Sequence, residues 1–164
     1  MPIHAEKRVL PYTPAQLFDL VADVERYPAF LPWCVAVRVR RQEIVESADG
    51  DDNLLVADMA IGFKVFRERF TTRVQCRRPE RIDVTYTDGP FRYLNNHWVF
   101  SPKGDNACEI DFFVDFEFRS AILQKAIGLV FNEAVQKMID SFEARAEVLY
   151  GPLVKSPYLS DRGT

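Results

Sequence analysis

The sequence has few of the residues from which catalytic and metal sites are most often built. It contains two histidines, His4 and His97, and neither lies beside a nucleophile motif. It also lacks a G-x-S-x-G motif, a glycine-rich phosphate loop and any His, Cys or acidic cluster with metal-ligand spacing. We therefore predict that the protein is not an enzyme, has no catalytic residues and needs no metal ion or cofactor.

Cysteines are scarce as well. The three present, Cys34, Cys76 and Cys108, are odd in number, widely spaced and without a C-x-x-C pair. This pattern is typical of reduced thiols in a cytoplasm-like compartment and not of a disulfide framework or a zinc site. Residues 1–20 lack the basic-then-apolar pattern of a signal peptide, and no apolar run reaches the roughly 18 residues that span a bilayer. We expect a soluble, cytoplasmic protein that is peripheral at the inner membrane if it contacts a membrane at all.

The chain also has no excess of basic residues. Its 21 lysines and arginines oppose 24 aspartates and glutamates, which leaves a formal net charge of −3. Nucleic-acid-binding domains typically present a strongly basic surface, so we do not expect DNA binding. Arginines nevertheless gather on the outer face of one predicted strand and just beyond it: Arg67, Arg69, Arg73, Arg77, Arg78 and Arg81.

This arginine face has two interpretations. In the first it is a solvated face, crossed by ion pairs to Asp58 or Asp83. In the second it docks on acidic lipid headgroups or on ribosomal RNA.

Apolar side chains are abundant: they make up 48% of the 164 residues and include 13 phenylalanines. This length suits one domain with a sizeable core, which we place at residues 1–151. Composition leaves open whether the phenylalanines fill a dense core or line a cavity. Residues 152–164 are polar and contain proline, so we expect a poorly ordered tail.

The last long segment predicts a helix over residues 120–149. Ser120 is a suitable cap, residues 121–150 contain no proline, and Gly151-Pro152 ends the pattern. Such a broad apolar face needs a broad apolar partner. Its apolar residues recur at spacings of three, four and seven: Leu123, Ile127, Val130, Phe131, Ala134, Val135, Met138, Ile139, Phe142, Ala146 and Leu149.

Most of the preceding chain has the period of β-strands. The exception follows residue 10, where Thr13-Pro14-Ala15-Gln16 forms a capping box with proline at the first helical position. One strand, two helical segments, six strands and a helix predict an α+β fold with an antiparallel curved sheet wrapped on the C-terminal helix. The expected strands are 2–10, 34–46, 54–63, 64–76, 81–87, 93–101 and 108–118, with the third and fourth hinged near Gly62.

This element order resembles the helix-grip fold of START-like lipid-transfer domains. Within it, the chain from about Ala5 to Gly151 resembles the coenzyme Q-binding family, which includes ribosome-association toxins and is often catalogued with polyketide cyclases. The residues that carry the resemblance are Tyr12 to Pro28, Phe30-Leu31-Pro32-Trp33-Cys34, Gly62-Phe63, Glu68 to Val74, Gly89-Pro90-Phe91, the alternation of Leu94, Asn96, Trp98 and Phe100, and Phe142 to Ala146.

The resemblance implies a protein that binds a lipophilic molecule, ubiquinone or a similar isoprenoid lipid, as a carrier or chaperone in respiration or quinone biosynthesis. A transient contact with the membrane surface would accompany that role. The main alternative is a toxin-like protein that binds a ribosomal subunit and blocks subunit association. A polyketide cyclase-like enzyme is the second alternative, and the missing acid–base residues argue against it.

We expect the ligand pocket between the sheet and the last helix. Gly128 lies within the helix's apolar arc, where a glycine leaves room or permits close approach. The apolar, irregular corner from Ala29 to Trp33 is our candidate for the entrance. The predicted ligand-binding residues are Leu31 and Trp33 at the entrance, Phe70, Tyr86, Trp98, Phe112, Phe116, Phe131 and Val135 on the walls, and Asn96, whose amide can orient a carbonyl.

Two charged residues interrupt the apolar faces. Glu68 shares a strand face with Phe66 and Phe70, and Arg145 falls inside the apolar arc of the helix. Because an isolated buried charge is costly and a pair is tolerable, we predict a polar contact between them in or near the pocket. In the alternative interpretation Arg145 extends to solvent and Glu68 lies at a rim.

Overall fold

The computed structural model describes residues 3–47, 50–63 and 66–151. The prediction of a poorly ordered tail at residues 152–164 lies outside this range. The elements in chain order are β1 (Ile3–Leu10), α1 (Pro14–Ala22), a 3-10 turn η1 (Val24–Arg26), α2 (Tyr27–Phe30), β2 (Cys34–Ser47), β3 (Gly50–Phe63), β4 (Phe66–Arg77), β5 (Arg81–Asp88), β6 (Phe91–Pro102), β7 (Cys108–Phe118) and α3 (Ala121–Tyr150).

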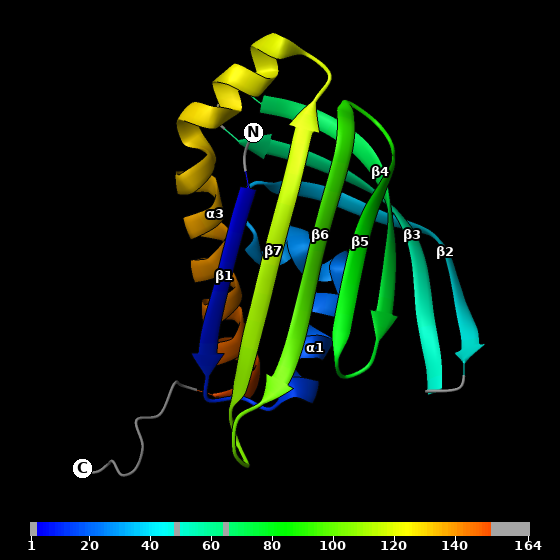
Figure 1. Ribbon diagram of the computed structural model, residues 1–164, viewed down its shortest axis with the longest axis vertical. Coiled ribbons are helices and arrows are strands. Elements are labelled where there is room, and N and C mark those ends of the chain that lie inside the picture. Colours follow the sequence, from blue (N-terminus) through cyan, green and yellow to red (C-terminus); the bar gives the residue numbers. More distant parts are fainter. Residues whose placement is uncertain (1–2, 48–49, 64–65, 152–164) are drawn as a thin grey trace.

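The strands form one antiparallel sheet in the order β1-β7-β6-β5-β4-β3-β2. β1 closes one edge by pairing with β7, from Ile3 opposite Asp115 to Leu10 opposite Cys108. Figure 1 shows the sheet curving around the long helix α3, with α1 behind the lower part of the sheet. The predicted α+β helix-grip architecture is therefore confirmed.

α1 begins as its sequence predicts. Thr13 Oγ1 accepts a hydrogen bond from Gln16 N at 3.1 Å, and Thr13 N donates to Gln16 Oε1 at 2.9 Å. This reciprocal capping box satisfies two backbone N–H groups at the helix start. Leu17 and Phe18 on its apolar side are buried, and the Phe18 ring meets the Phe100 ring of β6 edge-on at 5.9 Å.

α3 is one continuous helix, and its predicted bounds are confirmed. Ser120 Oγ accepts from Leu123 N at 3.2 Å, and Gly151, at φ 97°, ends the helix by donating to Glu147 O at 2.9 Å. Its buried residues include Val135 and Phe142, which face the sheet.

Two residues of the predicted apolar face of α3 lie elsewhere. Leu149 is 46% exposed, and Gly128 is exposed, with no atom within 4 Å of where its Cβ would be. The expectation that Gly128 makes room for a ligand or permits close approach is therefore wrong. Ile127 is buried against the sheet, and the next residue on a helix is turned about 100° from it, toward solvent.

Two strand boundaries differ from the predictions. β3 begins at Gly50, because Gly50 and Asn53 already pair with Ser47 and Ile44 of β2. It ends at Phe63, as predicted, whereas β6 begins at Phe91, two residues before the predicted Tyr93. The predicted irregular corner begins later than expected, because Tyr27–Phe30 forms a helical turn in which Leu31 N donates to Tyr27 O at 2.8 Å.

The buried apolar residues fall into two groups. The first, here the α1 cluster, surrounds α1 and the C-terminal half of α3 and has Leu17, Phe18, Ile82, Cys108 and Ala146 among its most buried members. The second, here the phenylalanine cluster, consists of Phe66, Phe91, Phe116, Phe118 and Ile127.

All three cysteines are free and buried. Burial raises the pKa of each thiol to about 11, so all three are protonated at neutral pH. They act as small apolar residues of the α1 cluster, as expected for Cys76 and Cys108. None of the helices in the described part of the chain has the length and apolar character needed to cross a bilayer.

Candidate ligand-binding cavity

A cavity of about 230 Å³ lies between the concave face of the sheet and α3. Members of both buried clusters line it, together with α2 and the first residues of β2. Every residue predicted to bind the ligand except Tyr86 is among its walls: Leu31, Trp33, Phe70, Asn96, Trp98, Phe112, Phe116, Phe131 and Val135.

The cavity exists because only part of the concave face is covered by two helices. α1 and α3 together bury the residues of the α1 cluster. Beyond α1, the inward-facing Val84, Leu94 and Val114 line the cavity and stay only half-buried. No side chain fills the space between them and α3, which leaves an apolar void of the kind that ligands occupy.

Aromatic rings close the far side of the cavity by packing against one another. Phe91 stacks on Phe118 at 4.8 Å and meets Phe116 edge-on at 5.6 Å, and Phe118 stacks on Phe66 at 6.3 Å. Phe116 in turn contacts Phe131 of α3, with ring centroids 5.6 Å apart. This chain of rings joins the sheet to the helix and leaves the centre of the cavity open.

Tyr86 does not line the cavity. Its hydroxyl accepts a hydrogen bond from Phe91 N at 3.2 Å, and its ring packs edge-on against the Phe91 ring at 5.4 Å. Phe91, which the predictions missed, lines the cavity itself. A register shift between Phe91 and Tyr93 breaks the alternation of β6, so simple period-two reasoning cannot place Phe91 on the inner face.

Other lining residues that were missed do carry a sequence signal. Phe66, Val84, Leu94, Val114 and Phe118 stand in phase with predicted wall residues on the same strands. The lining residues of α2, β2, β3 and α3 that were not predicted are Tyr27, Cys34, Met59, Ile61, Phe63, Ile127, Ala134, Met138 and Phe142.

The polar groups of the cavity walls are few. Asn96 Nδ2 donates to Phe113 O at 2.8 Å, and Asn96 Oδ1 accepts from Trp98 Nε1 at 3.1 Å. The Tyr27 hydroxyl donates to Val21 O. The amide of Asn96 keeps one N–H beyond these bonds, so its contact with a ligand carbonyl stays a prediction.

The predicted contact between Glu68 and Arg145 is absent from the structure. Arg145 stacks its guanidinium over Phe30, 5.4 Å from the ring centroid, and its buried Nε has no hydrogen-bond partner. Glu68 lies two residues from Phe66 of the phenylalanine cluster, whereas Arg145 precedes Ala146 of the α1 cluster. Periodicity assigns each residue to a face, but it does not say which residues of two facing elements meet.

The arginine face is only partly paired. Arg81 binds Asp83 at 2.8 Å, as predicted, but Asp58 is held by Arg40 at 2.6 Å and by Arg38 at 3.9 Å, both from β2. Arg77 and Arg78 pair with Asp52 and Asp19. Within the described part of the chain, Arg69 and Arg73 are exposed and form no ion pair.

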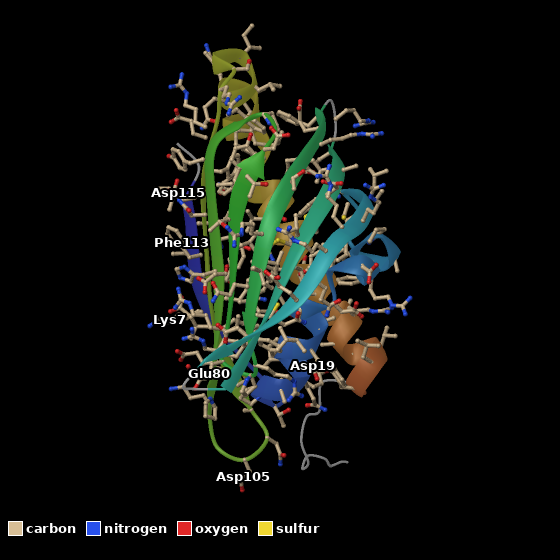
Figure 2. All side chains as sticks on the ribbon, turned by 90° about the vertical axis from the view of Figure 1, so that its right-hand side faces the viewer. Lys7, Asp19, Glu80, Asp105, Phe113 and Asp115 are labelled. Atoms are coloured by element: carbon tan, nitrogen blue, oxygen red, sulfur yellow. The ribbon has the colours of Figure 1, made fainter. Side chains whose placement is uncertain are left out.

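At the β1–β7 edge of the sheet, the outer face carries charged and apolar side chains together. Figure 2 shows Lys7 of β1 and Phe113 and Asp115 of β7 projecting away from α1 and α3. Glu6 and Arg8, which alternate with Lys7, point toward α3 instead.

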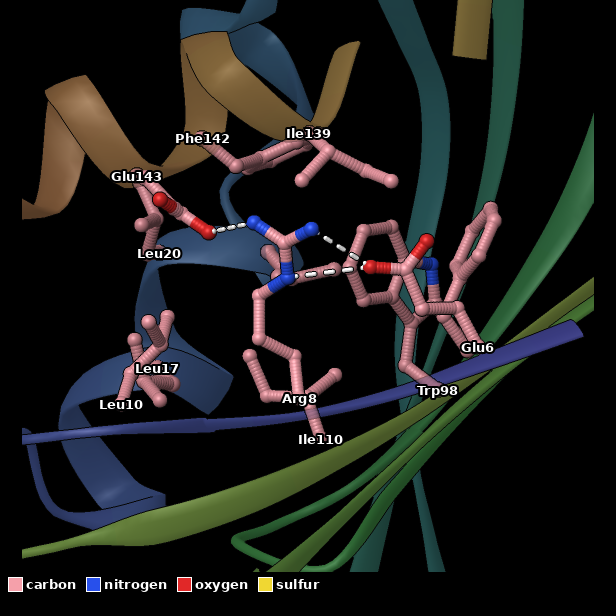
Figure 3. A pocket seen from close by; sticks show the side chains of 12 residues that line it. Glu6, Arg8, Leu10, Leu17, Leu20, Trp98, Ile110, Ile139, Phe142 and Glu143 are labelled. Carbon is pink, nitrogen blue, oxygen red and sulfur yellow. Dashed lines mark hydrogen bonds and ion pairs between the residues drawn. The ribbon is translucent and has the colours of Figure 1, made fainter. Parts of the chain in front are cut away.

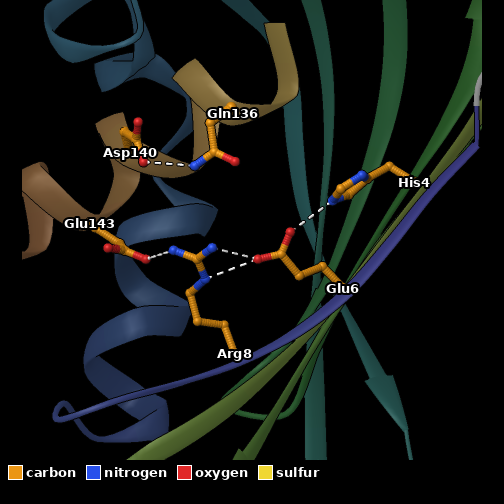
Figure 4. Close-up of polar contacts among 6 residues, drawn as sticks. All are labelled: His4, Glu6, Arg8, Gln136, Asp140 and Glu143. Carbon is orange, nitrogen blue, oxygen red and sulfur yellow. Dashed lines mark hydrogen bonds and ion pairs between the residues drawn. The ribbon is translucent and has the colours of Figure 1, made fainter. Parts of the chain in front are cut away.

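A second, smaller cavity of about 50 Å³ lies between β1, α1 and α3 (Figure 3). Its mouth is crossed by Arg8, which donates to Glu143 of α3 and to Glu6 Oε2 at 2.6 and 3.0 Å. His4 Nε2 lies 2.9 Å from Glu6 Oε1 (Figure 4). We call Glu6, Arg8 and Glu143 the Arg8 bridge, because they join the edge strand to the helix.

The Arg8 bridge shifts the ionisation of its members. Burial works to raise the pKa of Glu6, but hydrogen bonds from His4 and Arg8 outweigh it and hold that pKa below its usual value. The hydrogen bond to Glu143 raises the pKa of Arg8. Polar and apolar residues alternate only weakly in β1, so this inward-facing charged row was not predicted.

No group of His, Cys, Asp or Glu in the described ranges is arranged to hold a metal ion. The titratable groups that line the main cavity are Tyr27 and Cys34. Burial raises the pKa of both, that of Cys34 to about 11. Both side chains are therefore protonated near neutral pH.

Comparison with known proteins adds two named relatives. The chain is 38% identical over 144 residues to the ribosome association toxin RatA of Rickettsia prowazekii, across 85% of this chain and 92% of that protein. It is 30% identical over 152 residues to the mitochondrial coenzyme Q-binding protein COQ10 homolog B of Xenopus laevis, across 90% of this chain and 59% of that protein.

Solved structures share the fold. An 18 kDa protein from Caulobacter crescentus is 41% identical with a TM-score of 0.74, across 93% of this chain and all 100% of that one. A START superfamily protein from Mycobacterium smegmatis has a TM-score of 0.69 at 16% identity, across 90% of this chain and 98% of that one. A family model described as polyketide cyclase / dehydrase and lipid transport matches residues 10–143. The chain therefore belongs to the polyketide cyclase / dehydrase and lipid transport family.

Proposed function

We propose that the protein binds ubiquinone or a similar isoprenoid lipid in the main cavity and carries it without transforming it. The observation that supports this most is the almost wholly apolar cavity of about 230 Å³ beneath α3. Each methylene that leaves water for such a space gains about 0.8 kcal/mol, so a short isoprenoid segment supplies a large driving force. The relative named for coenzyme Q binding supports a quinone as the chemical class.

A carrier role also agrees with the chemistry of the walls. General acid–base catalysis needs a group whose pKa lies near the working pH. Tyr27 and Cys34, the titratable groups on the described walls, stay protonated because burial raises their pKa values. The ligand therefore meets no base, no nucleophile and no carboxylate there.

Loading requires an opening, and we place it at the corner between α2 and β2. Leu31 and Trp33 at this corner line the cavity, and Phe30 beside them packs on Phe142 of α3 at 5.3 Å. Val35, the second residue of β2, is 62% exposed and gives the corner an outward apolar side chain. Transient contact of this corner with a membrane surface would let a lipid pass from the bilayer into the cavity.

A second candidate function is docking on a ribosomal subunit through the arginine face. Two observations favour it: the similarity to a protein named ribosome association toxin, and the exposed Arg69 and Arg73 without an acidic partner in the described part of the chain. Arginines in this state can bind phosphate oxygens directly. Cavity and arginine face lie on opposite sides of the sheet, so the two functions can be tested separately.

The test is to purify the protein from cells, extract it with organic solvent and identify the lipids by mass spectrometry. We expect a quinone in near-equimolar amount, and saturable binding of added decylubiquinone after delipidation. An extract without quinone, together with no saturable binding, would overturn the carrier function. Co-sedimentation with a ribosomal subunit in the same preparation would then support the second candidate.

A further inference from the structure

We propose that the indole N–H of Trp33 binds the hydrogen-bond acceptor of the ligand, which for a quinone is one of its ring carbonyl oxygens. This inference rests on the proposed function, because it assumes that a lipophilic molecule with a carbonyl-bearing head occupies the cavity. In this proposal Trp33 selects ligands by the polar head that they carry. By binding that head it also sets the direction in which the ligand lies.

Trp33 Nε1 is a buried donor without a partner. The residue lines the cavity, and its ring nitrogen is shielded from solvent but donates to no acceptor. A buried tryptophan N–H usually finds an acceptor, because leaving it unpaired costs free energy. A ligand acceptor in the adjoining cavity would satisfy it once the indole rotates slightly, because the nitrogen has almost no surface exposed to the empty cavity.

The other side chains with N–H or O–H donors on the described walls each already donate one hydrogen bond. Trp98 Nε1 donates to Asn96 Oδ1, Asn96 Nδ2 donates to Phe113 O, and the Tyr27 hydroxyl donates to Val21 O. A second amide hydrogen of Asn96 and the weakly donating thiol of Cys34 remain. The Trp33 indole is thus the strong donor that this cavity leaves entirely unpaired.

The backbone holds Trp33 in place. Its carbonyl accepts from Gly62 N at 2.8 Å, and the next residue, Cys34, pairs with Ile61 and donates from its N to Leu31 O at 3.2 Å. The indole therefore starts from the fixed end of the β2–β3 ladder and not from a free loop. Because the backbone is fixed before the ligand arrives, only the side-chain torsions of Trp33 need to be ordered on binding.

The electrostatics of this corner favour a neutral acceptor. The Cys34 thiol beside Trp33 is buried and protonated, and no carboxylate lines the cavity within the described residues. A carbonyl oxygen meets no negative charge there. A fatty-acid carboxylate would find no cation on the walls, because Arg145, the cation of this corner, lies over Phe30 and is not among the lining residues. The chemical class selected is therefore a neutral lipid with a carbonyl head, such as a quinone.

The position of Trp33 also sets the direction of the tail. Trp33 packs against the α1 cluster, whereas the phenylalanine cluster forms another part of the wall. The rings of Phe66, Phe91, Phe116 and Phe118 offer no polar atom. An isoprenoid or alkyl tail would extend along them while the carbonyl stays at the α2–β2 corner.

The experiment uses the delipidated full-length protein, with its indoles labelled with ¹⁵N, and two probes with the same tail: decylubiquinone and decylbenzene. The protein has two tryptophans, so the Trp33→Phe variant assigns both indole signals. On saturation with decylubiquinone we expect the Trp33 Nε1–H signal to move downfield and to exchange more slowly with water. Decylbenzene should leave it without these changes.

Affinity supplies the second measurement. Trp33→Phe keeps an aromatic ring and removes the donor, so decylubiquinone should bind about five- to tenfold more weakly, the effect of one neutral hydrogen bond. Decylbenzene should bind both proteins equally.

The outcomes separate the two proposals. If decylubiquinone saturates the parent protein but leaves the Trp33 signal unchanged, the assignment of Trp33 is overturned and the carrier function stands. An equal loss of affinity for both probes in Trp33→Phe also overturns it, because it shows a role in cavity shape alone. If the parent protein binds neither probe, both proposals fall. The measurement on the parent protein decides the question even if the variant does not fold.

Discussion

The two ends of the sheet–helix sandwich are built from the same apolar alternation but differ in how well they are filled. Where α1 and α3 both cover the sheet, Ile82 is 1% exposed, and Cys108 and Ala146 are 0% exposed. Beyond α1, where α3 covers the sheet alone, Val84, Leu94 and Val114 are only half-buried around the cavity. The difference lies in the number of covering helices and not in the kind of residue.

The two regions differ in what they contribute: one stabilises the fold and the other leaves space for a ligand. The α1 cluster resembles an ordinary close-packed interior, in which each buried group contributes to stability. The residues of the cavity walls contribute less to stability, because the sides that face the cavity make no van der Waals contacts. The protein keeps its fold with one region and leaves the other available for a ligand.

The largest expected effect is in the packed region. Phe18→Ala should lower the free energy of unfolding by about 3–5 kcal/mol, because it opens a void in a filled core. Phe131→Ala, at the cavity wall, should cost about 1–2 kcal/mol, because that ring already borders empty space. Urea denaturation of the two variants measures the difference. Equal losses would show that the two regions are packed alike.

The next effect concerns the ligand. Decylubiquinone at a hundred times its Kd should raise the free energy of unfolding by about 2.7 kcal/mol if it binds the folded state alone. Chemical denaturation with and without the quinone measures this. The same experiment with Phe131→Ala should give a smaller gain, since a wall of the cavity is missing. A gain that does not depend on quinone concentration would contradict specific binding.

The smallest effect concerns the Arg8 bridge. The pKa of Glu6 lies below its usual value of 4.5 in the folded protein, so its contribution to stability is fully present above that value. It is lost as the pH falls through the lowered folded-state pKa. Glu6→Gln should therefore cost about 0.5–1 kcal/mol at pH 7 and less below pH 4.

Denaturation of the parent and Glu6→Gln proteins between pH 4 and pH 7 measures how much the bridge contributes to the free energy of unfolding. Gln136→Ala, on the helix α3 that carries Glu143, serves as a control for a surface substitution. Gln136 donates to Asp140 at 3.0 Å and takes no part in the bridge. If the difference between parent and Glu6→Gln is independent of pH, the bridge does not stabilise the fold through the Glu6 charge.

Much of this architecture could be predicted because its helices and strands show regular repeats of apolar residues in the sequence. Three signals predict the same bounds for α3: its continuous apolar spacing, its Ser120 cap and its end at Gly151. The observed helix, Ala121–Tyr150, agrees with them to within one residue. The strict alternation of β7 placed Phe112 and Phe116 on the cavity wall. Where many residues repeat one period, a single irregularity does not alter the prediction.

The failures lie where the outcome depends on relations between elements. An irregularity in the register of β6 places Phe91 on the inner face. Asp58 forms its ion pairs with Arg38 and Arg40 of β2 and not with an arginine of β4. Glu68 and Arg145 make no contact, because Arg145 lies over Phe30 instead. Sequence periodicity specifies a face, whereas pairing requires the register between elements, which one sequence does not reveal.

The central claim, that the cavity and not the arginine face performs the function, is tested most directly by one pair of variants. Val135→Trp fills the cavity from α3 and should abolish or strongly weaken decylubiquinone binding, at a cost of about 1–3 kcal/mol in stability from overpacking. Arg73→Glu reverses an exposed charge on the outer face and should bind the quinone like the parent. Titration of each folded, delipidated variant with decylubiquinone gives the answer. The claim is contradicted if Val135→Trp binds the quinone like the parent protein while Arg73→Glu alone loses activity in cells.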